Sequence, residues 1–173
     1  MQRIQFNFNR EKAIECIIYF SSRIIDPTFH SINKLLYFAD KTSLERYGRL
    51  ICGDDYYAMP LGPVPSHTYD LMKEAVKSSA LPFTVNGCSV IPKREANLDV
   101  FTESDVESLN KSIELYGKVP FWKRNQDSHD DAYNAAWQSR GECKSVRIPI
   151  ESIAHLLQDA DELIDYLANK GTD

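Results

Sequence analysis

Residues 31–48 read SINKLLYFADKTSLERYG, and this stretch predicts the central helix of the fold. Apolar side chains recur at helical spacing and also occupy other sides of the helix. A helix that is apolar around much of its circumference is usually buried. Gly48 comes directly after the last helical residue, where a glycine commonly ends a helix. We therefore place residues 31–47 at the centre of the domain, with Ile32, Leu35, Leu36 and Ala39 on one face and Tyr37, Phe38, Leu44 and Tyr47 elsewhere.

The rest of the chain predicts several helices and little strand around this centre. The first helix should end at Asp26-Pro27, because proline cannot continue the helical hydrogen bonds. Asn86-Gly87 predicts a type I′ hairpin turn between two short strands. The expected fold is mainly α within the α+β class, a compact bundle around a buried central helix with a small antiparallel β element and a hairpin. The helices are expected at 9–25, 66–77, 102–116, 130–138 and 150–169, and the strands at 55–59 and within 83–91.

A run of three prolines, Pro60-Leu61-Gly62-Pro63-Val64-Pro65, separates the strand at 55–59 from the next helix. Each proline fixes its φ angle and removes a backbone donor. Gly62 stands before a proline and can adopt backbone angles closed to other residues. We expect a stiff, irregular turn here, followed by Ser66 as the N-cap of a helix whose inner face is Tyr69, Met72 and Val76.

Composition restricts the class of protein. The 173 residues are 43% hydrophobic and 26% charged, which fits one soluble domain over residues 1–173. The net charge of −5 argues against nonspecific nucleic-acid binding, which needs excess Lys and Arg. No apolar run is long enough to span a bilayer, and the N-terminus lacks a signal peptide. The four scattered cysteines form no C-x-x-C pair, so we expect reduced thiols, no zinc site and a cytoplasmic location.

No stretch carries a catalytic signature, so we expect no catalytic residue, no bound metal and no cofactor. His67 has no recognisable nucleophile beside it in the sequence. The run 127–131 could supply metal ligands, but the same residues are typical of a helix start, where acids complement the helix dipole. Two alternatives stay open. One is a metal-dependent hydrolase using His129, Asp130 and Asp131, and the other is a nucleic-acid-binding module using Lys73, Lys77, Lys93, Arg94, Lys123 and Arg124.

Aromatic residues beside the proline run favour protein binding instead. Tyr56 and Tyr57 point to opposite faces of a strand, so one of them is an interface candidate. Tyrosine contributes large contact area at low entropic cost. The candidate partner-binding residues are Tyr56, Tyr57, Pro63, Pro65 and His67, whereas Tyr37, Tyr69 and Trp137 are expected in the core.

Several motifs in this order resemble the Panacea domain, the SocA-like antitoxin domain family. The chain has the Lys-Leu-Leu-Tyr helix, the Tyr-Gly-Arg step and Gly-Pro-Val-Pro before a helix that carries a tyrosine. The resemblance covers about residues 14–153. The chain departs from the family pattern at Thr42-Ser43, at Leu50 and near Met59-Pro60. The motif residues are Lys34, Leu35, Leu36, Tyr37, Tyr47, Gly48, Gly62, Pro63, Val64, Tyr69, His129 and Trp137.

The resemblance implies a non-enzymatic role. Members of this family are antitoxins of two-gene toxin–antitoxin systems, which bind and neutralise unrelated toxins, many of them inhibitors of translation. The expected partner is a cognate toxin encoded by a neighbouring gene. An adaptor role, in which the toxin is handed to an ATP-dependent protease, also occurs in the family. Some members are encoded by phages or prophages.

Overall fold

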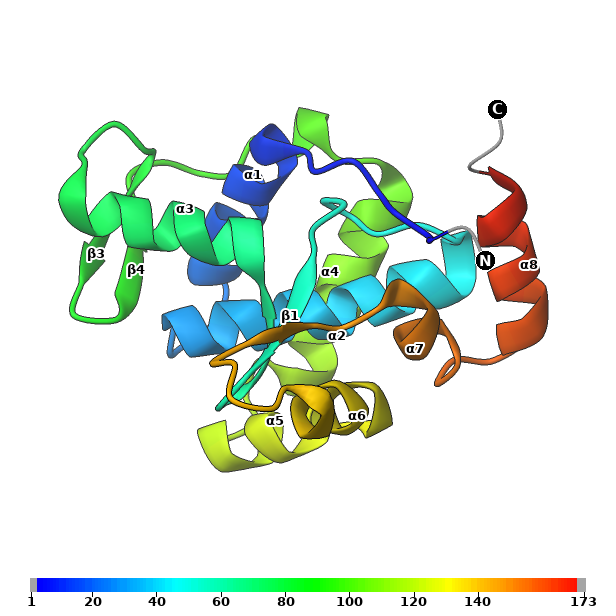
Figure 1. The fold of residues 1–173 in the computed structure, drawn as a ribbon. Coiled ribbons are helices and arrows are strands. Elements are labelled where there is room, and N and C mark those ends of the chain that lie inside the picture. Colours follow the sequence, from blue (N-terminus) through cyan, green and yellow to red (C-terminus); the bar gives the residue numbers. More distant parts are fainter. Residues whose placement is uncertain (1–2, 171–173) are drawn as a thin grey trace.

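The computed structural model describes residues 3–170, and it confirms the expected fold class of helices around a central helix with two small antiparallel sheets. Figure 1 shows α2 crossing the middle of the molecule. The helices are α1 Arg10–Ser21, α2 Phe29–Tyr47, α3 Ser66–Lys77, α4 Glu103–Tyr116, α5 Phe121–Ser128, α6 Asp131–Ser139, α7 Ile150–Ala154 and α8 Ala160–Lys170, with a 3₁₀ turn at Leu98–Val100. The strands are β1 Tyr56–Met59, β2 Gly62–Pro65, β3 Phe83–Asn86, β4 Ser89–Pro92 and β5 Val146–Arg147.

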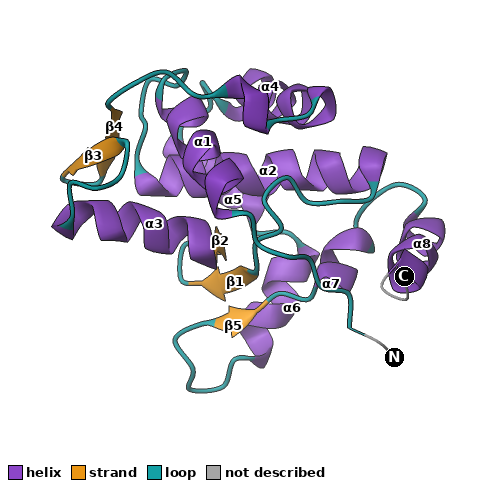
Figure 2. Ribbon diagram, turned by 90° about the horizontal axis from the view of Figure 1, so that it is seen from above, coloured by secondary structure: helices purple, strands orange, loops and turns teal. Residues whose placement is uncertain are grey.

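Helix α2 is buried because it belongs to two apolar clusters at once. Ile32, Leu35, Leu36 and Ala39 pack with α1, α3, α4 and the β3–β4 hairpin. The opposite side of α2 packs with β1, α6, α7 and α8. Figure 2 shows α2 between α4 on one side and strands β1 and β5 on the other. The central position predicted for this helix is confirmed, and Gly48 ends it with a φ of 63°.

The proline run forms a strand where the sequence predicted an irregular turn. Strand β2 pairs antiparallel with β1, from Tyr56 opposite Pro65 to Met59 opposite Gly62. The missing proline donors do no harm because β2 is an edge strand of the sheet β2-β1-β5. The true turn is only Pro60-Leu61. The prediction of a short strand at 55–59 was correct apart from its first residue.

The β3–β4 hairpin is confirmed, but its turn differs from the prediction. Asn86 pairs with Ser89, so the two turn residues are Gly87 and Cys88. Gly87 has a φ of 65°, and Cys88 is not among the described residues with positive φ. Glycine at the first turn position fits a type II′ turn rather than the expected type I′ turn. The hairpin tip is tied to the start of α2, where Phe29 N donates to Cys88 O.

One predicted helix ends early, and another is divided into two. Helix α1 stops at Ser21 rather than near residue 25, because the Ser22 hydroxyl donates to the Ile18 carbonyl and competes with the backbone ladder. Ile25, the last residue of the helix predicted over 9–25, is 86% exposed. The C-terminal helix expected over 150–169 is two helices, since the chain turns at Asp159, which has a φ of 55°.

Helix α5 was not predicted, and the helix expected at 130–138 begins one residue later. Helix α4 was predicted correctly, with Thr102 and Asp105 forming a capping box. In α3, Met72 faces the core as expected but Val76 is 58% exposed.

Candidate functional site

A groove of about 470 Å³ lies beside the first turns of α2. One wall is the start of α2, and the other is the β1–β2 turn. Helix α3, the hairpin tip and α5 complete it. The lining is mostly apolar and includes three motif residues, Lys34, Val64 and Tyr69. The full lining is Thr28, Phe29, His30, Asn33, Lys34, Met59, Pro60, Leu61, Val64, Tyr69, Cys88 and Phe121.

The Lys-Leu-Leu-Tyr and Gly-Pro-Val-Pro motifs meet at the back of this groove. The Lys34 ammonium donates to the Pro63 carbonyl at 2.8 Å. Gly62 has a φ of 109°, and a β-carbon there would lie 2.9 Å from Lys34 Nζ and 3.0 Å from Ser128 Oγ. Glycine is therefore needed at position 62 both for its backbone angle and for the space that the lysine fills.

Asp54 fixes α3 to the strand before it. Its carboxylate accepts from His67 N at 3.0 Å, from Thr68 N at 2.8 Å and from the Thr68 hydroxyl at 2.6 Å. The two backbone N–H groups are donors that an N-cap residue normally satisfies, so Asp54 caps α3 although it is distant in the sequence. The expectation that Ser66 caps this helix was wrong, since Ser66 is its first residue. The groove wall is thus attached to a rigid frame.

The polar groups in the groove are perturbed by burial. Lys34 is 1% exposed, and burial lowers the pKa of its ammonium to about 7. Burial, with the nearby Lys34 charge, lowers the pKa of His30 to about 4. His30 Nε2 lies 3.2 Å from Asn125 Oδ1, and its ring packs on Phe121. Within residues 3–170, Asn33 Oδ1 and His30 Nδ1 are buried without a hydrogen-bond partner.

The five candidate partner-binding residues are divided between core and surface. Tyr56 is fully buried and donates to Asp40 Oδ2 at 2.7 Å, so it supports the sheet rather than a contact surface. Pro63 and Pro65 are also buried. Tyr57 is partly buried, and the exposed His67 ring stacks on Phe8. None of the five lines the groove, and only Tyr57 and His67 reach the surface.

The remaining motif residues build the frame. Leu35, Leu36 and Tyr37 are buried in α2, and the Tyr37 hydroxyl donates to Asp130 Oδ2 at 2.6 Å. The Tyr47 hydroxyl donates to Glu107 Oε2 at 2.6 Å. His129 follows the last residue of α5, and Trp137 is only partly buried, stacked on Tyr133 and beneath Arg140.

The residues of the metal hypothesis do not converge. Asp130 caps α6 and also accepts from Lys41 Nζ at 3.0 Å, while Asp131 is exposed. Across residues 3–170, no three His, Cys, Asp or Glu side chains are grouped as a metal site would require.

The basic residues of the nucleic-acid hypothesis do not form a free stripe. Arg124 is fully buried and bonds Asp26, Ser31 and two carbonyls. Lys73 pairs with Asp70, Arg94 with Glu15 and Lys123 with Asp127. Most of the positive charge assigned to that surface is therefore already neutralised by carboxylates of the chain.

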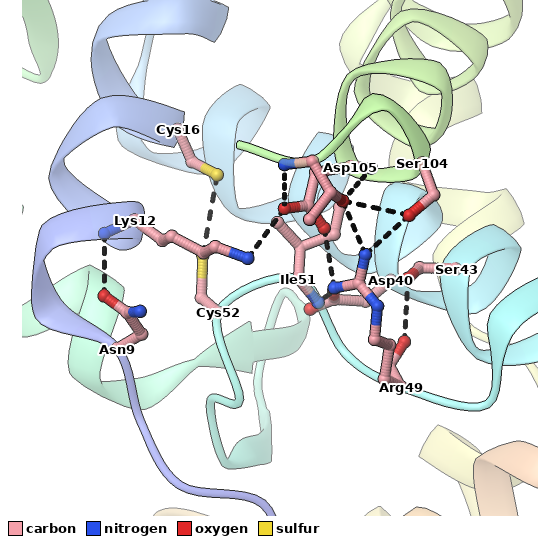
Figure 3. A network of polar contacts seen from close by, with 11 residues as sticks. Asn9, Lys12, Cys16, Asp40, Ser43, Arg49, Ile51, Cys52, Ser104 and Asp105 are labelled. Carbon is pink, nitrogen blue, oxygen red and sulfur yellow. Dashed lines mark hydrogen bonds and ion pairs between the residues drawn. The ribbon is translucent and has the colours of Figure 1, made fainter. Parts of the chain in front are cut away.

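A polar network away from the groove holds Arg49, the last residue of the Tyr-Gly-Arg motif (Figure 3). Buried Asp105 accepts from Lys12 Nζ at 2.7 Å and forms an ion pair with Arg49 Nη1 at 2.7 Å. Nearby, the Cys16 and Cys52 sulfur atoms are 3.5 Å apart and buried, and the hydrogen bond with the Cys16 thiol, together with burial, raises the pKa of Cys52. This network joins α1, α2 and α4 and is structural.

Sequence reasoning missed the groove's own residues. His30, Asn33 and Phe121 line it, and Phe121 and Trp122 are 49% and 65% exposed. Asn33 carried a signal, because an amide in a helix that is otherwise apolar on several sides is costly without a partner. Phe121 carried none, since α5 itself was not predicted.

A match to a known domain family over more than half of the chain identifies the family. The model of the SocA-like antitoxin Panacea domain matches residues 32–138. The chain belongs to this family. The match includes β1, β2, α3 and all of α2 except its first three residues, and therefore most of the groove lining. No curated protein and no solved structure matched the chain. Within residues 3–170, no helix is long and apolar enough to cross a membrane.

Proposed function

We propose that this Panacea protein is an antitoxin that neutralises a toxin by direct protein–protein contact. The family match over residues 32–138 carries the proposal. The expected partner is the product of a neighbouring gene, and the expected place of action is the cytoplasm. No chemical step by this chain is part of the proposal.

We place the toxin contact at the groove and its rim. Leu61, Phe121 and Trp122 are exposed on or beside this rim, and aromatic and large apolar side chains dominate the energetics of interfaces. The frame behind it is rigid: Pro63 and Pro65 lie in a paired strand, and Asp54 and Lys34 fasten this strand region to α3 and α2. A preorganised surface loses less entropy on binding.

Co-expression with the neighbouring reading frame tests the proposal. The wild-type chain should restore growth to cells that express the toxin and should co-purify with it. Leu61→Asp should abolish both effects because it places a charge on the contact surface. Val76→Asp is the matched control: Val76 is 58% exposed against 55% for Leu61, but it lies on α3 outside the groove. A neighbouring product that is harmless, or that the wild-type chain neither binds nor suppresses, would refute the antitoxin role.

Toxin half-life separates simple sequestration from an adaptor role. If the chain only sequesters the toxin, the toxin persists in the complex. If it delivers the toxin to an ATP-dependent protease, co-expression shortens the toxin half-life, and loss of the protease restores it.

A further inference from the structure

Lys34 is a buried amine, and the described residues provide no counter-charge for its protonated form. Its side chain is 1% exposed, and no carboxylate within residues 3–170 forms an ion pair with it. Its one hydrogen bond goes to a neutral carbonyl, that of Pro63. An ammonium has three donors, so two remain without a described partner. Burying an unpaired charge costs several kcal/mol, and this cost lowers the pKa of Lys34.

Two further polar atoms of groove-lining residues, Asn33 Oδ1 and His30 Nδ1, also lack a hydrogen-bond partner among the described residues. Asn33 is 4% exposed, and its Oδ1 atom has no hydrogen-bond partner among the described residues. Asn33 and Lys34 are consecutive residues of α2, and both line the groove. An unused acceptor beside an unused donor group is expected where a ligand supplies the missing partners, because buried polar groups are otherwise almost always paired.

The chemistry of the walls describes the ligand. Phe29, Met59, Leu61 and Val64 offer apolar surface, whereas the free donors belong to Lys34. A fitting ligand therefore has an apolar body and one negative charge that reaches inward. Because Lys34 is almost fully covered, the charge must arrive at the end of a side chain rather than on a bulky group.

We propose that the groove binds an apolar segment of the partner protein, with the carboxylate of a glutamate on Lys34. This rests on the proposed antitoxin function and specifies the toxin segment that it would recognise. A backbone N–H of the same segment would donate to Asn33 Oδ1. The segment would lie between the start of α2 and the β1–β2 turn, where exposed Leu61 and Phe121 flank the groove.

A second copy of this chain is a less suitable occupant. Each copy carries a net charge of −5, so two copies repel one another. A glutamate from an unrelated partner also compensates a charge that the free protein leaves unpaired, which adds specificity against partners that lack it.

The test measures the dissociation constant of the toxin for Lys34→Met and for Lys123→Met. Methionine keeps the length of lysine without its charge, and replacing a buried charge by an apolar side chain is often tolerated. Lys123 lies on α5 next to Phe121, is exposed and pairs with Asp127, so it controls for general positive charge near the rim. We expect Lys34→Met to weaken toxin binding about tenfold or more and Lys123→Met to change it less than about twofold.

Glutamate-to-glutamine variants of the toxin identify the acid without any change to this chain. One of them should weaken binding to the wild-type chain about tenfold, and should have no further effect on Lys34→Met. The effect of the toxin variants on binding to the wild-type chain can be measured even if Lys34→Met does not fold. Equal binding by the wild-type chain and folded Lys34→Met, or coupling of Lys34 to the toxin C-terminus instead, overturns the inference and leaves the antitoxin role standing. Self-association of the free chain through the groove overturns it too. Failure of the wild-type chain to bind removes both.

Discussion

Adding one methyl group at Gly62 tests whether the junction of the two motifs is as tight as the geometry indicates. In Gly62→Ala the new β-carbon would meet Lys34 Nζ at 2.9 Å, Lys34 Cε at 3.0 Å and Ser128 Oγ at 3.0 Å. The φ of 109° adds backbone strain of about 1–3 kcal/mol. Displacing Lys34 breaks its hydrogen bond to Pro63 and leaves buried polar groups unpaired, at about 1–3 kcal/mol. The expected loss of stability is about 3–5 kcal/mol.

Gly87→Ala is the matched control. Gly87 also has a positive φ, 65°, but nothing lies within 4 Å of its ideal β-carbon. Only the cost of a left-handed residue remains, about 1–2 kcal/mol. Urea unfolding followed by circular dichroism measures both variants, with the slope checked for two-state behaviour. A Gly62→Ala variant that unfolds at the same urea concentration as Gly87→Ala would refute the tight junction.

Three further substitutions test other parts of the frame. Burial raises the pKa of Asp40 from 3.8 to about 7, so the folded state binds the Asp40 proton more tightly than the unfolded state does. The stability gained from this proton is complete below about pH 4 and is lost as the pH rises to about 7. Asp40→Asn should therefore gain stability relative to wild type between pH 4.5 and pH 7.5 in urea unfolding; a constant difference contradicts this. Trp137→Ala should cost about 2 kcal/mol, less than the 3–5 kcal/mol of a full core tryptophan, because Trp137 is only partly buried against the second cluster. Arg124→Met should cost about 3–5 kcal/mol by thermal unfolding, since it leaves Asp26 and two carbonyls without their buried partner; an unchanged melting temperature would show that this network adds nothing.

The sequence predicted well those features that local chemistry determines. Helix α4 has its capping box at Thr102 and Asp105, and α2 has apolar residues on several sides with Gly48 at its end. These signals act within one or two turns of chain. The early end of α1 and the break at Asp159 depend on weaker signals, a serine hydroxyl and a single left-handed residue, which the apolar periodicity concealed.

Long-range contacts account for most of the rest. Strand β2 exists because β1 accepts it as an edge partner, and nothing in Gly-Pro-Val-Pro alone indicates a strand. Asp54 caps α3 from 13 residues away, so the local candidate Ser66 was the wrong choice. Tyr56 was proposed as a contact, but a carboxylate on α2, Asp40, holds its hydroxyl in the core. The groove could not be predicted because its walls come from five separate segments.

The structure separates motif residues that build the frame from residues that form the groove wall. Lys34, Gly62 and Pro63 form one buried contact, and a change in any of them disturbs the other two. By contrast, Met59 and Pro60, near which the chain departs from the family pattern, line the groove. Because the wall and the frame are made of different residues, a change in the wall can leave the packing around α2 intact. If the proposed toxin contact lies at this wall, a different partner then requires a changed wall and no change in the frame.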